Sequence, residues 1–290
     1  MKTKKFIPYI FIAPAFSIFL IFIIYPGILG FIVSMYKTSY SFGPSTFVGF
    51  NNYFSVFKSP NFLEALGRTF LFSALEIPTI YFISLGLALL MTSPSVKAKS
   101  VLRVFFFLPS VLSGVITALI WDWMLNYDFG FINNLFTILG LKNIPFLLNP
   151  TYAFISLALI MSWAASGFFM VIFIAGIQSI PVELYEAAEI DGATTFKKFS
   201  SITLPMLRPT SILVVILSTI QSMQLFDIPF VLTGGGPGES TTFAVEKVYN
   251  TAFINLNMGL ASSMSFVLFL IFLAIGLLQF KISREGQFWA

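Results

Sequence analysis

The sequence QSIPVELYEAAEIDGATTFKKFSSITLPMLR, residues 178–208, is a charged island in a chain made mostly of apolar runs. It holds seven of the chain's 16 basic and 12 acidic residues: Glu183, Glu186, Glu189, Asp191, Lys197, Lys198 and Arg208. Long apolar segments lie on both sides of it. The nature of those apolar segments therefore decides where this loop lies and what it can contact.

The composition excludes a water-soluble domain. Of 290 residues, 57% are hydrophobic and only 10% are charged, and Phe alone occurs 37 times. A soluble domain carries roughly 25% charged residues. A chain so poor in charge could not cover a water-facing surface, so we expect lipid to be its solvent.

The charged and reactive residues restrict function further. The net charge of +4 is spread over short basic clusters between apolar segments, which favours a membrane surface over nucleic acid as the partner. Cys and His are both absent. Their absence excludes disulfides, Cys or His metal sites, Cys nucleophiles and His general bases.

A hydrocarbon core of ~30 Å needs ~20 helical residues. Apolar segments of this length predict six spans, at about residues 10–35, 70–91, 104–125, 152–177, 211–230 and 260–280. Pro and Gly inside several of them are tolerable where neighbouring helices satisfy the freed backbone groups. The first apolar run continues from Phe6 to Met35, which favours an uncleaved span over a signal peptide.

The distribution of Lys and Arg predicts the orientation. With the N-terminus inside, the inner segments hold 11 of the basic residues and the outer segments hold five, out of 16. Because basic residues favour the cytoplasmic side, both termini and the loop at 178–208 are predicted to be cytoplasmic.

The first half of the loop is predicted to be a short helix. Pro181 suits the first helical position. Residues Val182 to Ile190 are mostly good helix formers. Asp191-Gly192 then ends the helix, since glycine readily takes the left-handed conformation found after a helix C-terminus.

The second half is predicted to be another short helix. Thr194 or Thr195 can cap it, and it should run towards Leu204 and stop at Pro205. From these residues alone the loop is either a linker on the membrane surface or a helix that enters a cleft on a partner protein.

The spacing within the loop resembles the EAA signature of ABC importer permeases. EAA at 186–188, G at 192 and I-x-L-P at 202–205 fill every fixed position of EAA-x3-G-x9-I-x-L-P. P-x3-Y at 181–185 and DGAT at 191–194 strengthen the match. A docking helix is therefore favoured over a linker.

Two further segments extend the resemblance along the chain. Residues 102–109 look like the family's third span, and TGGGP at 233–237 looks like the loop after the fifth span in its sugar-transporting branch. The chain is similar to the first permease subunit of maltose, multiple-sugar and glycerol-3-phosphate importers. It departs from the maltose member in lacking extra N-terminal spans and a large external domain.

The resemblance implies an all-α protein of the cytoplasmic (inner) membrane, with the MetI-like fold of a type I ABC importer permease. Residues 1–36 would be an N-terminal transmembrane helix, and residues 67–281 the permease domain containing the loop at 178–208. The implied partners are a second homologous permease subunit, an ABC ATPase dimer and an extracellular or periplasmic solute-binding protein that delivers a sugar. No cofactor is expected on this chain, because ATP and Mg would bind the partner ATPase.

By the same resemblance the loop docks in a groove of the ATPase. Glu186 would make the polar contact, Ala187 and Ala188 would allow close approach, and Gly192 would set the bend. The coupling residues implied are Tyr185, Glu186, Ala187, Ala188, Asp191, Gly192, Ala193, Leu204 and Pro205. Closure of the ATPase dimer on ATP would move this helix and open the cavity outward by rigid-body rotation.

Substrate contacts are predicted on two spans. One face of the fifth span carries residues at i, i+3, i+4 and i+7: Ser218, Gln221, Ser222 and Leu225. On the fourth span, four residues occupy positions that resemble the sugar-facing ones of the maltose member: Trp163, Ala164, Ala165 and Phe168. Hydrogen bonding between helices and contact with lipid are the alternatives for these residues.

Three acidic residues lie within or near the spans. Asp122 and Asp227 are interpreted as anchors at the outer membrane interface. Glu76 is expected to meet a partner inside the helix bundle, since facing lipid would be costly.

The rival functions differ in what they require. A permease for glycerol phosphate or another anion would need basic residues facing the cavity, and the spans offer almost none; a polyamine is the other non-sugar solute considered. A membrane-embedded enzyme would need a catalytic pair such as Ser–His, which a chain without His lacks. A self-sufficient channel would leave the EAA loop unexplained.

Overall fold

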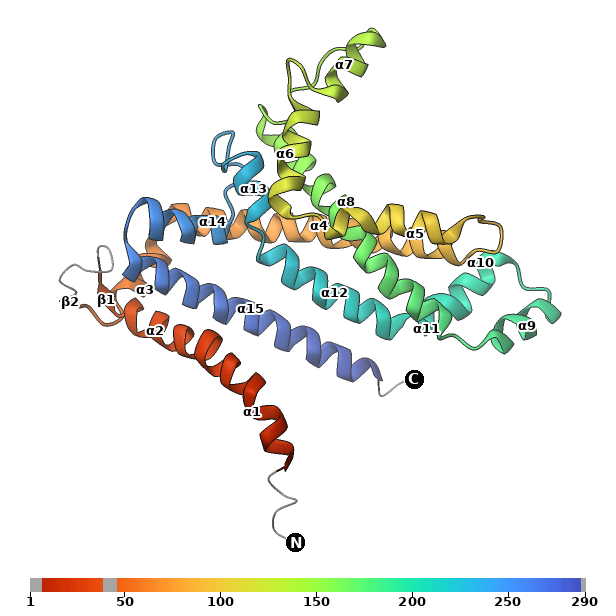
Figure 1. Cartoon of the computed structure of the whole chain (residues 1–290), viewed down its shortest axis with the longest axis horizontal. Coiled ribbons are helices and arrows are strands. Elements are labelled where there is room, and N and C mark those ends of the chain that lie inside the picture. The colour runs from red at the N-terminus through yellow and green to blue at the C-terminus, as the bar shows by residue number, and fades with distance from the viewer. Residues whose placement is uncertain (1–6, 39–45, 288–290) are drawn as a thin grey trace. The chain divides into compact units, whose positions relative to one another are not determined.

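A computed structural model describes residues 7–38 and 46–287 (Figure 1). The described chain is helical apart from one short sheet, which confirms the predicted all-α class. It forms two compact units. The first comprises Met1–Glu64 and Lys247–Leu273, and the second comprises Ala65–Glu246 and Ala274–Ala290.

The first unit begins with one long apolar helix. It consists of α1 (Ile7–Phe19), a π-helical turn η2 (Leu20–Ile24) and α2 (Tyr25–Ser34). The candidate span within it, Phe11–Ser34, confirms the first predicted span. All side chains from residue 11 to residue 29 are exposed, as is expected of a helix whose surroundings are lipid or another chain.

A small sheet and short helices complete the first unit. These are β1 (Tyr36–Lys37) paired antiparallel with β2 (Thr46–Phe47), α3 (Asn51–Lys58), the start of α4 (Pro60–Thr92), the end of α14 (Ala244–Tyr249), a π-helical turn η5 (Asn250–Ile254) and the first part of α15 (Met258–Gln287). The rings of Phe31 on α2 and Phe266 on α15 pack with their centroids 4.8 Å apart.

The second unit contains most of α4, the end of α15 and the elements between α4 and α14. These are α5 (Lys99–Phe107), η3 (Leu108–Val111), α6 (Gly114–Leu125), α7 (Phe131–Ile138), α8 (Pro150–Gln178), α9 (Val182–Ile190), α10 (Thr195–Lys198), η4 (Phe199–Thr203), α11 (Leu204–Met206), α12 (Arg208–Met223) and α13 (Asp227–Leu232).

Helix α8 is at the centre of this unit. Two thirds of its candidate span is buried, more than in any other candidate span of the described chain. It contributes to two apolar clusters: Phe169 and Phe173 lie in one, and Leu157 packs with Phe72 and Phe243 in the other. Because both apolar clusters pack against α8, the side chains on its buried faces are held rigidly.

The predicted third span differs from prediction. Instead of one helix over 104–125, the segment forms α5–η3, which ends at Val111, and α6, which begins at Gly114, and the two lie at 100° to each other. Pro109 lacks an N–H and sits in the 3-10 turn η3. Leu112 and Ser113 are extended, so the helical hydrogen bonds stop there. The segment is a broken span or a re-entrant loop.

The other predicted spans are confirmed with shifted ends. The candidate spans are Pro60–Thr92, Pro150–Gln178, Arg208–Leu232 and Met258–Ile282. With the first span these make five, or six if the broken pair counts as one, in the described part of the chain. The side of the membrane on which the termini lie stays a prediction.

Candidate functional site

The loop predicted to dock on an ATPase begins with α9, whose bounds, Val182–Ile190, coincide with the prediction. Pro181 precedes the helix as its N-cap, with an extended ψ of 130°, rather than forming its first turn. Figure 1 shows α9 and α10 beyond the end of α8, on the side away from α7. Most side chains of α9 are exposed, and Tyr185 is the one that packs against the core of the unit.

Gly192 ends α9 as predicted, at φ +72°. The N–H of Ala193 donates to the carbonyl of Ala188 at 2.8 Å, and that of Gly192 donates to the carbonyl of Glu189 at 3.0 Å. These two bonds form a Schellman motif, which needs a left-handed residue at this position. The motif fixes the direction in which the chain leaves the helix.

The next segment is longer than predicted. Thr194 caps α10, because its Oγ1 accepts from the N–H of Lys197 at 3.3 Å. The helical path does not stop at Pro205: it widens into the π-helical turn η4 and continues through α11. A proline in a regular α-helix clashes with the carbonyl four residues earlier. The wider π turn just before Pro205 removes this conflict.

Two side-chain contacts connect the two halves of the loop. The hydroxyls of Tyr185 on α9 and Thr203 on η4 are 2.9 Å apart. Lys198 Nζ donates to Glu189 Oε1 at 2.7 Å. This hydrogen bond, with the positive charge of Lys198, holds the pKa of Glu189 below its usual value. The loop is therefore a bonded unit rather than an extended linker.

The outer surface of this loop combines exposed acidic side chains, Glu186 among them, with exposed apolar side chains. Glu186 and Ala187 are exposed and Ala188 is half-buried. Ile190 is 87% exposed and Phe196 is 77% exposed. Large apolar side chains exposed together, beside small residues and a carboxylate, are typical of a protein-docking surface.

A cavity of about 490 Å³ lies in the second unit, among η3, α6, α8, α12 and α13. Its polar lining consists of Ser110, Thr117, Gln221, Gln224 and Asp227. Its apolar lining includes Met161, Phe168 and Leu225. Hydroxyl, amide and carboxylate groups around an aromatic ring can hydrogen-bond and stack on a polyhydroxylated ligand.

The structure separates the predicted substrate-pathway residues into two sets. Five line the cavity: Ala164, Ala165, Phe168, Gln221 and Leu225. Three do not: Trp163, Ser218 and Ser222. Ser218 and Ser222 are fully buried, and their hydroxyls donate to the Val215 carbonyl and to Ser73. Trp163 lines a neighbouring apolar cavity of about 300 Å³ and packs edge-to-face on Trp121.

Sequence reasoning missed the polar end of this cavity. Asp227, interpreted as an interfacial anchor, lines the cavity and lies so close to Gly114 that a Cβ at this glycine would overlap Asp227 Oδ2. The break between α5 and α6 brings Gly114 next to Asp227. Because the sequence predicted a straight third span, this contact could not be foreseen. Gln224 follows the last residue of α12, and its spacing from Gln221 at i and i+3 could have indicated a shared face.

Glu76 is buried inside the second unit, as predicted, with no exposed surface. The polar group that its carboxylate meets is the Ser222 hydroxyl, without a hydrogen bond of ordinary geometry to either carboxylate oxygen among the described residues. Ser222 lies beside it but donates to Ser73 at 2.9 Å.

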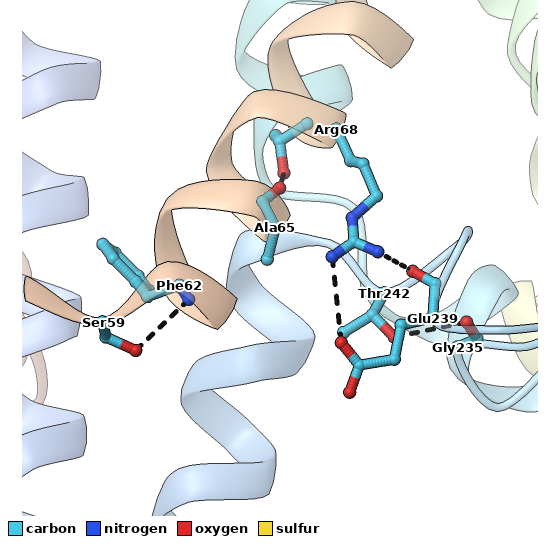
Figure 2. Close-up of polar contacts among 8 residues, drawn as sticks. Ser59, Phe62, Ala65, Arg68, Gly235, Glu239 and Thr242 are labelled. Atoms are coloured by element: carbon cyan, nitrogen blue, oxygen red, sulfur yellow. Dashed lines mark hydrogen bonds and ion pairs between the residues drawn. The ribbon is translucent and has the colours of Figure 1, made fainter.

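The glycine-rich segment predicted outside the membrane is fastened to α4. Figure 2 shows Arg68 reaching from α4 to Glu239, where the guanidinium donates to the backbone carbonyl and lies 3.8 Å from the carboxylate. The Thr242 hydroxyl donates to the carbonyl of Gly235 at 3.2 Å (Figure 2). The segment is thus a closed loop held by polar contacts.

The sequence of this chain is similar to those of known transport proteins. A family model described as binding-protein-dependent transport system inner membrane component matches residues 82–284. The sulfoquinovosyl glycerol transport system permease protein SmoG of Agrobacterium fabrum is 34% identical over 274 residues, which cover 94% of this chain and 89% of SmoG. The trehalose/maltose transport system permease protein MalF of Thermococcus litoralis is 35% identical over 277 residues, covering 95% and 93%.

A solved structure shares the fold. A chain in the crystal structure of a bacterial ABC transporter involved in the import of the acidic polysaccharide alginate superposes with a TM-score of 0.86. The likeness covers 98% of this chain and 96% of that one, at 24% identity, and it concerns the fold alone. The chain therefore belongs to the binding-protein-dependent transport system inner membrane components, as a multi-pass permease subunit of the cytoplasmic membrane rather than an enzyme.

Proposed function

We propose that this chain carries a sugar across the cytoplasmic membrane by alternating access, driven by a separate ATPase that docks on α9. The observation that carries the proposal is that Glu186 and Ala187 are exposed beside the half-buried Ala188, on a helix ended by Gly192. Small side chains let a partner approach the helix backbone closely, and Glu186 offers it a charged hydrogen-bond acceptor.

The loop has a route for passing motion to the membrane. The contact between Tyr185 and Thr203 joins α9 to η4. From η4 the helical path runs through α11 into α12, and α12 supplies Gln221 to the wall of the cavity. A rigid displacement of α9 would therefore move one wall of the cavity, as the hinge and shear mechanisms of transporters require.

The lining of the cavity favours a neutral, polyhydroxylated substrate. Gln221, Gln224 and Thr117 can donate and accept hydrogen bonds, and the Phe168 ring can stack on a sugar face. None of its lining residues is Lys or Arg, and Asp227 would repel an anion. The name of one relative, a trehalose/maltose transport system permease, agrees with a neutral carbohydrate.

The proposed assembly follows from the transporter class. A second homologous permease subunit would complete the pathway, an ABC ATPase dimer would bind ATP and Mg, and a solute-binding protein would deliver the sugar. A related alginate transporter has been solved in complex with its pentasaccharide-bound periplasmic protein. With 11 of 16 basic residues in the segments on one side, both termini and α9 would be cytoplasmic.

Charge reversal at Glu186 tests the coupling proposal. The importer would be purified through a tag on this chain, and the amount of co-purified ATPase and the rate of sugar uptake by proteoliposomes would be measured. We expect Glu186→Lys to reduce both, because a buried unpaired charge at the interface is unfavourable.

Asp128→Lys is the matched control, since Asp128 is also an exposed acidic residue, in the turn after α6. It should leave ATPase recovery unchanged. Undiminished assembly and uptake in Glu186→Lys would refute the assignment of α9 as the docking helix.

A further inference from the structure

A groove of about 430 Å³ in the second unit is separate from both sites above. It lies between α4, α12 and the end of α15. Its walls are mainly aliphatic, formed by Ile212, Val215, Ile216 and Ile282. From Arg208 to Ile216 it follows α12 for roughly 12 Å at the helical rise per residue.

The groove reaches the level where two spans end. Arg208 is the first residue of the candidate span Arg208–Leu232, and Ile282 is the last residue of the candidate span Met258–Ile282. Both line the same groove. Because apolar spans end at the polar headgroup region, this end of the groove lies near the depth of lipid phosphates.

The side chain of Arg208 supplies a positive charge at that end of the groove. Arg208 is exposed, and its guanidinium makes no hydrogen bond or ion pair among the described residues. A guanidinium offers five donors in a planar fork that matches the oxygens of a phosphate. The groove therefore has an unmatched anion-binding group at the membrane surface and aliphatic walls below it.

Most polar groups deeper in the groove are paired, although Gln279 Oε1 is buried without a hydrogen-bond partner among the described residues. The hydroxyls of Tyr81 and Ser211 are 2.9 Å apart, and the Gln279 amide donates to Thr219 Oγ1 at 2.8 Å. These pairs tie α12 to α4 and to α15. A sugar would find few free partners here, whereas an acyl chain requires none.

We propose that this groove binds one anionic phospholipid, with an acyl chain along α12 and its phosphate on Arg208. Charge complementarity at the mouth and aliphatic walls below it match the two parts of such a lipid. A neutral or zwitterionic lipid offers the same chain but no net negative charge, so the groove selects anionic lipid.

Native mass spectrometry of the intact importer tests the proposal. The delipidated complex would be titrated with phosphatidylglycerol or with phosphatidylcholine of the same chain length. We expect one tightly retained phosphatidylglycerol per copy of this chain. Arg208→Gln should weaken that binding about tenfold, since a charge-assisted hydrogen bond is lost. Lys97→Gln removes an exposed basic residue outside the groove and should change the affinity less than about twofold.

A second variant tests the acyl chain without touching the charge. Val215→Trp fills the groove and should also weaken phosphatidylglycerol binding, while glycerol phosphate without acyl chains should not compete. Because the chain has no cysteine, Val215→Cys can carry a photoreactive label at one site. Adducts with lipid support the proposal.

Three results would overturn it. They are equal retention of phosphatidylcholine, unchanged phosphatidylglycerol binding by Arg208→Gln in a complex that still assembles, or a label at Val215→Cys that reacts with another protein subunit.

Discussion

The hydroxyls of Tyr185 and Thr203 lie 2.9 Å apart, and this contact joins α9 to the π-helical turn η4 across 18 residues of chain. Tyr185 also packs against the apolar cluster that contains Phe169 and Phe173. One side chain therefore connects the exposed helix α9, the segment leading into α12 and the core of the unit.

Loss of this hydroxyl contact should loosen the coupling without unfolding the chain. A hydrogen bond contributes roughly 1 kcal/mol, so Tyr185→Phe should lower the ratio of sugar transported to ATP hydrolysed by about fivefold. Thr203→Val should have a similar effect, and the double variant should be no worse than either single one. Additive losses would show that the two residues act separately.

The Glu189–Lys198 contact predicts a pH dependence of loop stability. Because the pKa of Glu189 is lowered in the folded protein, its contribution is fully present above the unfolded value of about 4.5 and is lost as pH falls below it. Hydrogen exchange in residues 182–206, corrected for intrinsic rates, should be slower in the wild type than in Glu189→Gln at about pH 7. The two should converge as pH falls well below that unfolded value, and a constant difference would contradict the assignment.

Gly192 and Gly140 form a matched pair. Their φ values are +72° and +73°, both have open space where a Cβ would be added, and both follow a helix with Schellman hydrogen bonds. Alanine at either position should cost about 1–2 kcal/mol of local backbone strain. Only Gly192→Ala should reduce sugar uptake, because Gly140 follows α7 and not α9, the helix proposed to dock on the ATPase. Equal uptake by both variants would remove Gly192 from the coupling route.

The contact between Gly114 and Asp227 predicts a steric effect. A Cβ at Gly114 would overlap the Asp227 carboxylate, so Gly114→Ala should destabilise the subunit by about 1–3 kcal/mol, measured by thermal unfolding in detergent. Asp227→Ala should relieve part of that loss in the double variant. Gly86→Ala, in α4 with open space around it, should be neutral or stabilising.

Variants at Gln221 and Ser218 should distinguish a role in substrate contact from a role in helix packing. Gln221 lines the cavity, whereas the Ser218 hydroxyl donates to the carbonyl of Val215. Gln221→Ala should raise the KM for uptake by up to about tenfold, the effect of one or two lost hydrogen bonds. Ser218→Ala should leave KM unchanged. The sugar for this assay would be chosen by a thermal-shift screen of the cognate binding protein, and an unchanged KM in Gln221→Ala would exclude it from the substrate pathway.

Local chemistry was sufficient to predict α9. Its bounds, the left-handed Gly192 and the cap at Thr194 depend on neighbours within a few residues, and the residue types there allow few alternatives. The same holds for the apolar spans, since their length and composition are properties of single segments.

Tertiary packing decided what the sequence left open. Pro109 and Gly114 are compatible with a kinked helix or with a break, and the 100° bend was set by how α5 and α6 pack on α8 and α13. That bend brought Gly114 to Asp227 and opened the cavity.

The fifth span shows the same limit. Ser218, Gln221, Ser222 and Leu225 share one helical stripe in the sequence, yet Gln221 and Leu225 line the cavity while the two serines are buried. Helical periodicity fixes which residues share a stripe. Which residues of that stripe are buried depends on the neighbouring helices. Burial is decided by packing between segments that are distant in the chain.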